Sequence, residues 1–323
     1  MPHDHRHDGA HDGRGGACGG HGHLHHRHVL PPGGLDRAMA IGIGLNTAFV
    51  AIEIAAGVVG GSLALLADAG HNAGDVVGLL LAWGAARLAR RPPTPRYTWG
   101  LRRATIWATL ANALLLFVAC GGILREALVR FGAPVPVAGP TMIAVAAVGV
   151  AINGFTALLF MRGARGDANV RGAFLHMAAD AAVSAGVVVA GVAIALTGQA
   201  WIDPVVGIAI TGAILVGTWD LFREGLEMGL DAVPREIDPQ ALADALGGLP
   251  GVSEVHDLHV WKASTSEVSL SVHLVVPDAA RHGAVLAEAG ARLRDGFAIA
   301  HTTIQIEDAD AAERCPQRPA DTL

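Results

Sequence analysis

The chain has 323 residues, of which 52% are hydrophobic and 16% are charged, and its formal net charge is −6 at pH 7. With a mean hydropathy of +0.43, it differs from an ordinary soluble domain, in which about 25% of residues are charged. The negative charge, together with an acidic C-terminal segment whose only lysine is Lys262, argues against nucleic-acid binding.

The first 34 residues are rich in histidine, glycine and aspartate, and nine histidines fall within the first 28 positions. This composition cannot form a hydrophobic core, so we expect residues 1–34 to be a disordered arm. Neutral imidazoles bind transition metals, so one interpretation is an arm that collects metal ions. The alternative is a solvated tail with no specific role.

Six apolar stretches follow, and each is long enough for a membrane-spanning helix, which takes about 20 residues. They lie at about 37–60, 62–88, 101–130, 139–162, 172–197 and 201–224. Arginines gather in the second and fourth connections, whereas the opposite connections carry almost no charge. The positive-inside rule then predicts that both termini are cytoplasmic. Arg125 and Arg130, near the outer end of the third stretch, are exceptions to this pattern.

Two histidine–aspartate pairs interrupt these apolar stretches. His71 and Asp75 are four residues apart, and so are His176 and Asp180. This spacing places each pair on one face of a helix, about one turn apart. Two nitrogens and two carboxylates match the ligand number and type of a tetrahedral zinc site. We therefore predict one metal site between the second and fifth helices.

Further polar residues lie in the same membrane region. Asn46 and Glu53 are seven residues apart on one helix face, and Asp68 precedes His71 by three residues. Because a charge at membrane depth costs about 2.5 to 3.5 kcal/mol, Glu53 and Asp68 are functional candidates, with Asn46 as an accessory polar residue. For Glu53 a buried structural carboxyl is an equal alternative. For Asp68 we favour an acid that bonds a neighbouring helix over a metal ligand, and for Asp203 a cap of the last apolar helix.

The C-terminal segment, from residue 231, is polar and acidic. It predicts a helix capped near Asp238 and stopped at Gly247 or Gly248, strands over 252–263 and 266–276, a helix over 281–297, and a strand over 301–308. This α-β-β-α-β order suggests a small α+β layer with helices on one face. We place the domain at 231–310 and a disordered tail at 311–323.

This domain also holds five histidines, which favour a second metal locus as a group, although each alone is typical of a partly exposed surface. They are His256, His259, His273, His282 and His301. The three cysteines, Cys18, Cys120 and Cys315, fit no CxxC or disulfide pattern.

Several segments together resemble the cation diffusion facilitator family, in its zinc-type branch of bacterial zinc and cadmium exporters and vertebrate ZnT proteins. They are SLALLADAGHNAGD, YTWGLRR, FLHMAAD, GVSEVHDLHVW and HTTIQIE, with the Asn46 and Glu53 pair. The resemblance covers about residues 35–308. It implies a homodimer of six-helix protomers with a ferredoxin-like cytoplasmic domain, alternating access and proton exchange. It also implies a transport site at His71, Asp75, His176 and Asp180.

For the cytoplasmic domain the resemblance implies a less complete site. His256 and His273 match positions that bind zinc in some relatives. Gln305 stands where a relative has histidine, and Glu307 where it has aspartate. We therefore expect a structural or regulatory zinc site that is incomplete or has moved to His301, with His256, His273, His301 and Glu307 as its candidates. No organic cofactor is expected.

Together these observations predict a multi-pass protein of the bacterial inner membrane, with a six-helix domain at 35–230 in contact with lipids. We expect Zn²⁺ efflux in exchange for H⁺; ligand identity does not separate Zn²⁺ from Cd²⁺, Co²⁺ or Ni²⁺. The alternative is a membrane-bound metal sensor or scaffold without transport, which the histidines outside the bilayer support. An enzyme is not expected, because neither HExxH nor a nucleophile with a paired base is visible.

Overall fold

The structure is a computed structural model that describes residues 34–133, 135–161 and 168–318. The chain divides into two units after Ile41. The predicted histidine-rich arm lies outside the described residues, except for Gly34, where the first helix begins.

Six long helices occupy the six predicted apolar stretches. They are α1 (Gly34–Gly60), α2 (Leu63–Ala89), α3 (Ala104–Gly132), α4 (Gly139–Met161), α5 (Ala168–Thr197) and α6 (Ile202–Gly229). Four of them, α3 to α6, contain segments long and apolar enough to cross a membrane. Among the described residues the test therefore bears out four of the six expected spans, and the other two stay a prediction. α1 has a shorter apolar part, Asn46–Gly60, and in α2 the polar residues Asp68, His71 and Asp75 lower the hydropathy.

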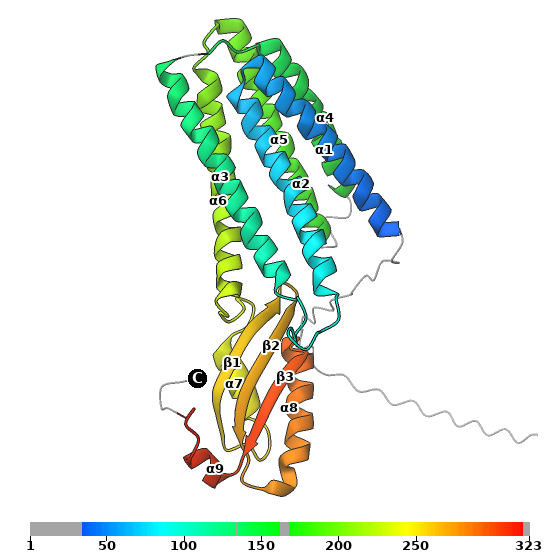
Figure 1. Cartoon of the computed structure of the whole chain (residues 1–323), viewed down its shortest axis with the longest axis vertical. Helices are drawn as coiled ribbons and strands as arrows, with labels where there is room; N and C mark the ends of the chain where they lie inside the picture. Colours follow the sequence, from blue (N-terminus) through cyan, green and yellow to red (C-terminus); the bar gives the residue numbers. More distant parts are fainter. Residues whose placement is uncertain (1–33, 134, 162–167, 319–323) are drawn as a thin grey trace, which may run out of the picture. The chain divides into compact units, whose positions relative to one another are not determined.

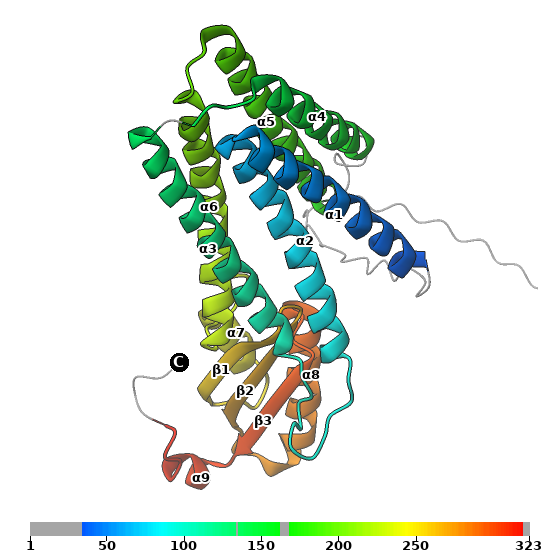
Figure 2. The same ribbon diagram turned by 45° about the horizontal axis from the view of Figure 1, so that its top comes forward.

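The helices pack in pairs. α3 lies along α6 and α2, while α4 lies along α5, in both views of the bundle (Figures 1 and 2). Small residues allow the close approach of α4 and α5: a Cβ on Gly191 would lie 2.8 Å from the Ile143 side chain. Such contacts matter in a bilayer, where helices associate through packing because lipid is as apolar as their side chains.

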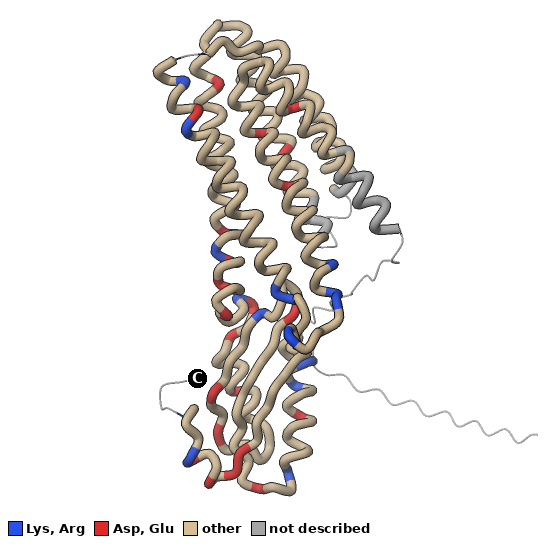
Figure 3. Tube along the Cα trace, viewed as in Figure 1, with Lys and Arg blue, Asp and Glu red and all other residues tan. Residues whose placement is uncertain are grey.

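Charge is unevenly distributed along the bundle. Arginines gather where α2 ends and α3 begins, whereas the middle of α3 to α6 is almost free of charge (Figure 3). Two of these arginines pair with the C-terminal domain, Arg102 with Glu267 at 2.7 Å and Arg103 with Asp231 at 2.6 Å. The other predicted basic connection, at 162–167, lies outside the described residues.

The C-terminal domain has the predicted α-β-β-α-β order. It consists of α7 (Pro239–Gly247), β1 (Glu254–Ser264), β2 (Glu267–Val275), α8 (His282–Phe297) and β3 (His301–Glu307). β2 lies between its neighbours, antiparallel to β1 and parallel to β3. The predicted cap is confirmed, since the Asp238 carboxylate accepts from the Gln240 N–H and Gly248 ends α7.

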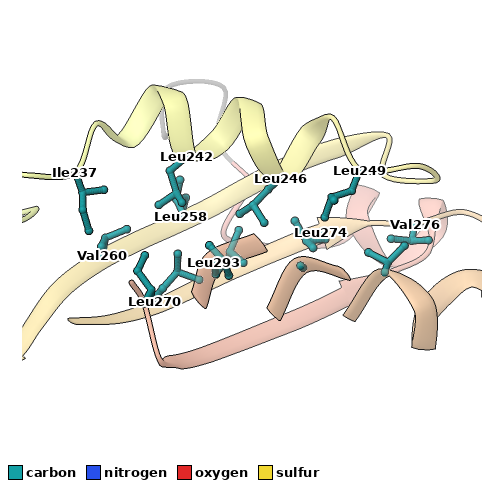
Figure 4. Close-up of a cluster of buried hydrophobic side chains, with 14 residues drawn as sticks. Ile237, Leu242, Leu246, Leu249, Leu258, Val260, Leu270, Leu274, Val276 and Leu293 are labelled. Atoms are coloured by element: carbon teal, nitrogen blue, oxygen red, sulfur yellow. The ribbon is translucent and has the colours of Figure 1, made fainter. Parts of the chain in front are cut away.

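One hydrophobic cluster holds this domain together. Leu242 and Leu246 of α7 point toward Leu270 and Leu274 of β2 and Leu293 of α8, and all five are fully buried (Figure 4). The alternation along β2 puts these leucines on one face and leaves Ser271 and His273 on the other. The helices therefore cover one face of the sheet, and the polar residues line the other.

The predicted tail at 311–323 needs a correction as far as residue 318. A short helix, α9 (Ala309–Glu313), begins after Asp308, whose side chain accepts from the Ala311 N–H. Arg318 then donates to both carboxylate oxygens of Glu254 in β1. Residues 319–323 lie outside the described part of the chain.

We predict that Leu293→Ala destabilises the C-terminal domain by about 2 to 5 kcal/mol, because it leaves a cavity in the cluster. Hydrogen exchange of the full-length protein should then show faster exchange in β1 and β2. Leu286→Ala is the matched control, since Leu286 lies on the same helix but is 42% exposed. Equal exchange in the two variants would contradict the prediction.

Candidate metal centres

The two histidine–aspartate pairs of α2 and α5 converge. The Nε2 atom of His71 lies 3.0 Å from Oδ1 of Asp180 and 4.0 Å from Oδ2 of Asp75. The Nε2 atom of His176 lies 3.3 Å from Oδ2 of Asp75 and 3.6 Å from Oδ2 of Asp180. The two imidazoles meet edge to face, with centroids 6.1 Å apart. Each histidine therefore reaches both aspartates.

These separations suit a small tetrahedral cation. Zinc bonds to nitrogen and oxygen of about 2.0 to 2.2 Å imply ligand atoms roughly 3.3 Å apart. The four separations in the site, from 3.0 to 4.0 Å, bracket that value. Donor atoms of His71, Asp75 and Asp180 lie within 4.8 Å of one another, and His176 reaches both carboxylates from α5.

The site is more exposed on one side than on the other. The side chains of Asp180 and His71 are 5% and 22% exposed, while those of Asp75 and His176 are 33% and 47% exposed. Asp75 and His176 lie one turn closer to the arginine-rich end of the bundle than their partners do. The site therefore opens toward that end.

Two further carboxylates are buried beside the site. Asp68 accepts from the hydroxyl of Ser184 at 2.9 Å, and Glu53 accepts from the amide of Asn72 at 2.9 Å. The second oxygen of each has no hydrogen-bond partner among the described residues. The Asp68 contact agrees with an acid that bonds a neighbouring helix. Asn46, which shares α1 with Glu53, is exposed.

Asp203 does not cap α6, which begins with Trp201 at its cap. Its carboxylate instead accepts from the hydroxyl of Ser62 and from the N–H groups of Leu63 and Ala64 at the start of α2. The prediction that it caps its own helix is therefore corrected. The physical reason is that the start of α6 packs against the start of α2, where N–H groups have no intrahelical partner.

A second cluster lies on the polar face of the C-terminal sheet. His256 and His273 are direct partners across β1 and β2, and Glu307 ends β3. Glu307 lies 3.3 Å from Nε2 of His256 and 3.2 Å from Nδ1 of His273. The Sγ atom of Cys315 lies 3.6 Å from the same Nδ1. The four residues offer donor atoms within 4.8 Å of one another.

The chemistry of this cluster fits a transition metal. His256 is 3% exposed, yet neither of its ring nitrogens has a hydrogen-bond partner among the described residues. Such unpartnered polar atoms are costly unless an unseen ion or water satisfies them. Desolvation raises the pKa of the Cys315 thiol, and nearby Glu307 raises it further. Metal binding there would therefore displace a proton from sulfur.

The cluster differs from the predicted set by one residue. His301 stands at the opposite end of β3, beside Ser269, and its ring packs on Trp99 at 4.4 Å. Cys315 takes the fourth position instead. Sequence spacing could not reveal this, because Cys315 returns to the site only through the turn of α9. A thiolate ligand from Cys315 would also make the centre selective for softer cations.

Comparison with known proteins bears on both parts of the chain. Residues 39–228 match the cation efflux transmembrane domain, and residues 234–309 match the cation efflux protein cytoplasmic domain. The chain belongs to the cation efflux family. The predicted resemblance is confirmed, and the protein is a multi-pass membrane protein of divalent-cation efflux.

Three relatives cover most of the chain. The metal cation efflux system protein CzcD of Cupriavidus metallidurans is 36% identical over 307 residues, 93% of this chain and 95% of its own. The zinc transporter ZitB of Escherichia coli is 35% identical over 289 residues, 89% and 92% respectively. The cadmium, cobalt and zinc/H(+)-K(+) antiporter of Bacillus velezensis is 30% identical over 289 residues, 88% and 92%.

A solved structure, the metal-bound C-terminal domain of the CzcD transporter from Cuprividus metallidurans, is 38% identical in sequence. It covers 22% of this chain and 99% of its own, with a TM-score of 0.21.

We predict that zinc added to the full-length protein acquires one sulfur ligand per occupied C-terminal centre, at about 2.3 Å. X-ray absorption should detect this sulfur, and Cys315→Ala should remove it. His301→Ala is the control and should leave the spectrum unchanged, because His301 lies at the other end of β3. A sulfur signal that persists in Cys315→Ala would contradict the assignment.

Proposed function

We propose that the protein exports Zn²⁺ in exchange for H⁺ by alternating access, as a homodimer. The observation that carries this proposal is the convergence of His71, Asp75, His176 and Asp180 within two apolar helices. Charged groups at that depth are costly, and they are retained mainly where an ion or a proton requires them.

The proposed topology has six membrane spans. α1 and α2 join α3 to α6 as spans because their polar side chains, such as Glu53 and Asp68, are buried rather than facing lipid. Arginines at the α2–α3 connection favour cytoplasmic termini, and bacterial relatives favour a bacterial inner membrane. The proposed domains are an arm at 1–34, the spans at 35–230, a ferredoxin-like domain at 231–310 and a tail beyond it.

Ligand type supports zinc as the cargo. A site with two imidazoles and two carboxylates suits zinc and its neighbours, whereas oxygen-only sites suit magnesium, calcium or manganese. Cd²⁺, Co²⁺ and Ni²⁺ remain within the proposed substrate class. The names of the relatives include both a zinc transporter and a cadmium, cobalt and zinc antiporter.

The shared contacts suggest how metal and protons compete. Without metal, protons on the imidazoles satisfy the aspartates, and the 3.0 Å contact between His71 and Asp180 is one such hydrogen bond. A bound cation needs both imidazoles neutral, so its arrival displaces protons. Reprotonation at the other side of the membrane would then release the metal and reset the empty site.

The homodimer is supported by the cytoplasmic domain. Its family model is named for dimer formation.

A second candidate function is a metal sensor or scaffold without transport. The observation that favours it is the cluster of His256, His273, Glu307 and Cys315, which lies outside the spans. This candidate predicts metal binding with no flux.

We predict that His71→Ala and Asp180→Ala each abolish zinc-dependent proton flux in proteoliposomes, because each removes a proposed ligand. Asp220→Asn is the control, since Asp220 is an exposed carboxylate of α6. Unchanged flux in both alanine variants would remove the transport assignment. Zinc binding without flux in the wild type would favour the sensor.

We also predict that zinc affinity at the transport site falls as pH drops. The neutral imidazole is the binding form, so protonation opposes binding and the affinity recovers as pH rises. Two competing protons would weaken binding by up to about 100-fold per pH unit. Calorimetry in buffers of different ionisation enthalpy would count the protons released on zinc binding. The Cys315→Ala protein is used because this variant removes a ligand of the C-terminal centre. A count of zero would contradict the exchange mechanism.

A further inference from the structure

A polar network joins three helices at the end of the bundle opposite the arginine-rich α2–α3 connection. The carboxylate of Asp203 in α6 is fully buried. It accepts from the Ser62 hydroxyl at 2.7 Å and from the N–H groups of Leu63 and Ala64 at 2.5 and 3.1 Å. Its anionic charge thus sits at the positive end of the α2 dipole.

Arg130 brings α3 into the same network. Its guanidinium lies 3.4 Å from Asp203 and donates to the carbonyl of Gly61 at 2.5 Å. Its side chain is only 11% exposed and also bonds Glu126 at 3.1 Å. This explains why a basic residue stands at the outer end, against the charge rule for loops. Arg130 neutralises a buried acid between helices.

The turn between α1 and α2 is built tightly into the network. The Ala138 N–H donates to the Gly60 carbonyl at 2.8 Å. Gly61 has a φ of +67°, and a Cβ there would lie 2.7 Å from the Pro136 carbonyl oxygen. Glycine is therefore required at this position. The connections that precede α2 and α4 are held together with the start of α6.

This network lies on the closed side of the metal site. Ser62 precedes His71 by nine residues, roughly 13 Å along a helix. Between them Leu63, Leu65 and Asp68 are buried, and Asp68 is bonded to Ser184 of α5. The opposite side of the site is the exposed one. These buried side chains therefore lie between the metal site and the start of α2.

We propose that Asp203, together with Arg130 and Ser62, is the outer gate of the transport path. This inference rests on the proposed function and orientation. Release of the cation outward requires the start of α6 to part from the start of α2, which breaks these bonds and admits water to both charges. Asp203 is thus a positioning residue, because it stabilises the outward-closed state and touches no cargo.

The charge of Asp203 is what biases the equilibrium. In the closed state, Asp203→Asn leaves the buried Arg130 with only the more exposed Glu126 as a counter-ion and removes the anion from the α2 terminus. In the open state both groups are hydrated, so the same change costs little there. A change that destabilises only one state shifts the population toward the other.

The test measures access from outside to a cysteine placed between the gate and the metal site. Ser184→Cys provides this reporter, in a background with Cys18, Cys120 and Cys315 replaced by serine. Spheroplasts are treated with a membrane-impermeant maleimide, and the labelling rate is followed. We expect Asp203→Asn to raise this rate at least about tenfold. Asp220→Asn, the same change at an exposed site of α6, should leave it unchanged.

Two checks separate a gate from general damage. Each variant must elute as a single folded species in detergent, and its zinc affinity at the transport site should stay within about twofold of the parent. If Asp203→Asn does not fold, the labelling rate of Arg130→Gln is measured instead. Ser62→Ala removes only one hydrogen bond to Asp203 and is the mildest substitution. An unchanged labelling rate in a folded variant overturns the gate. Because the assay uses no zinc, failure of the zinc flux test would leave its result standing.

Discussion

The sharing of two aspartates by two histidines, deep in an apolar bundle, is the constraint on which the rest of the molecule depends. Neither pair is satisfied by its own helix, since each imidazole needs a carboxylate from the facing helix as well. α2 and α5 must therefore stay in register near His71 and His176, although few other residues bind these two helices together. The contact of Asp68 with Ser184 adds a second polar bond on the buried side.

The two ends of the bundle are built differently, and the difference has an electrostatic origin. At one end arginines pair with exposed acids such as Glu267 and Asp231, where water screens each pair and its net contribution is small. At the other end Arg130 and Asp203 are nearly buried, so each charge depends on the other. The end with exposed ion pairs can rearrange at little cost in free energy, whereas a buried ion pair favours one discrete closed state.

The cluster in the C-terminal domain resembles the one between α2 and α5 in ligand type, but it includes a softer sulfur ligand. It replaces one carboxylate with the Cys315 thiol and lies on a rigid sheet, with His256 and His273 fixed as direct strand partners. The contact of Arg318 with Glu254 holds the segment that carries this cysteine beside β1. A metal bound at this centre would therefore hold the tail segment against the sheet.

The sequence alone determined the elements and the pairing of histidine with aspartate on two of the helices. Hydrophobic periodicity marked all six long helices and all three strands, and the spacing of His71 with Asp75 and of His176 with Asp180 fixed a common face within each helix. These are local properties, set by the helical repeat and the strand alternation. What only the tertiary structure decided are the partners between elements: Asp203 caps another helix, Arg130 neutralises it, and Cys315 rather than His301 completes the second cluster. Such pairings depend on which helix ends and tail segments lie close together in the folded chain, and the spacing of residues in the sequence does not give that distance.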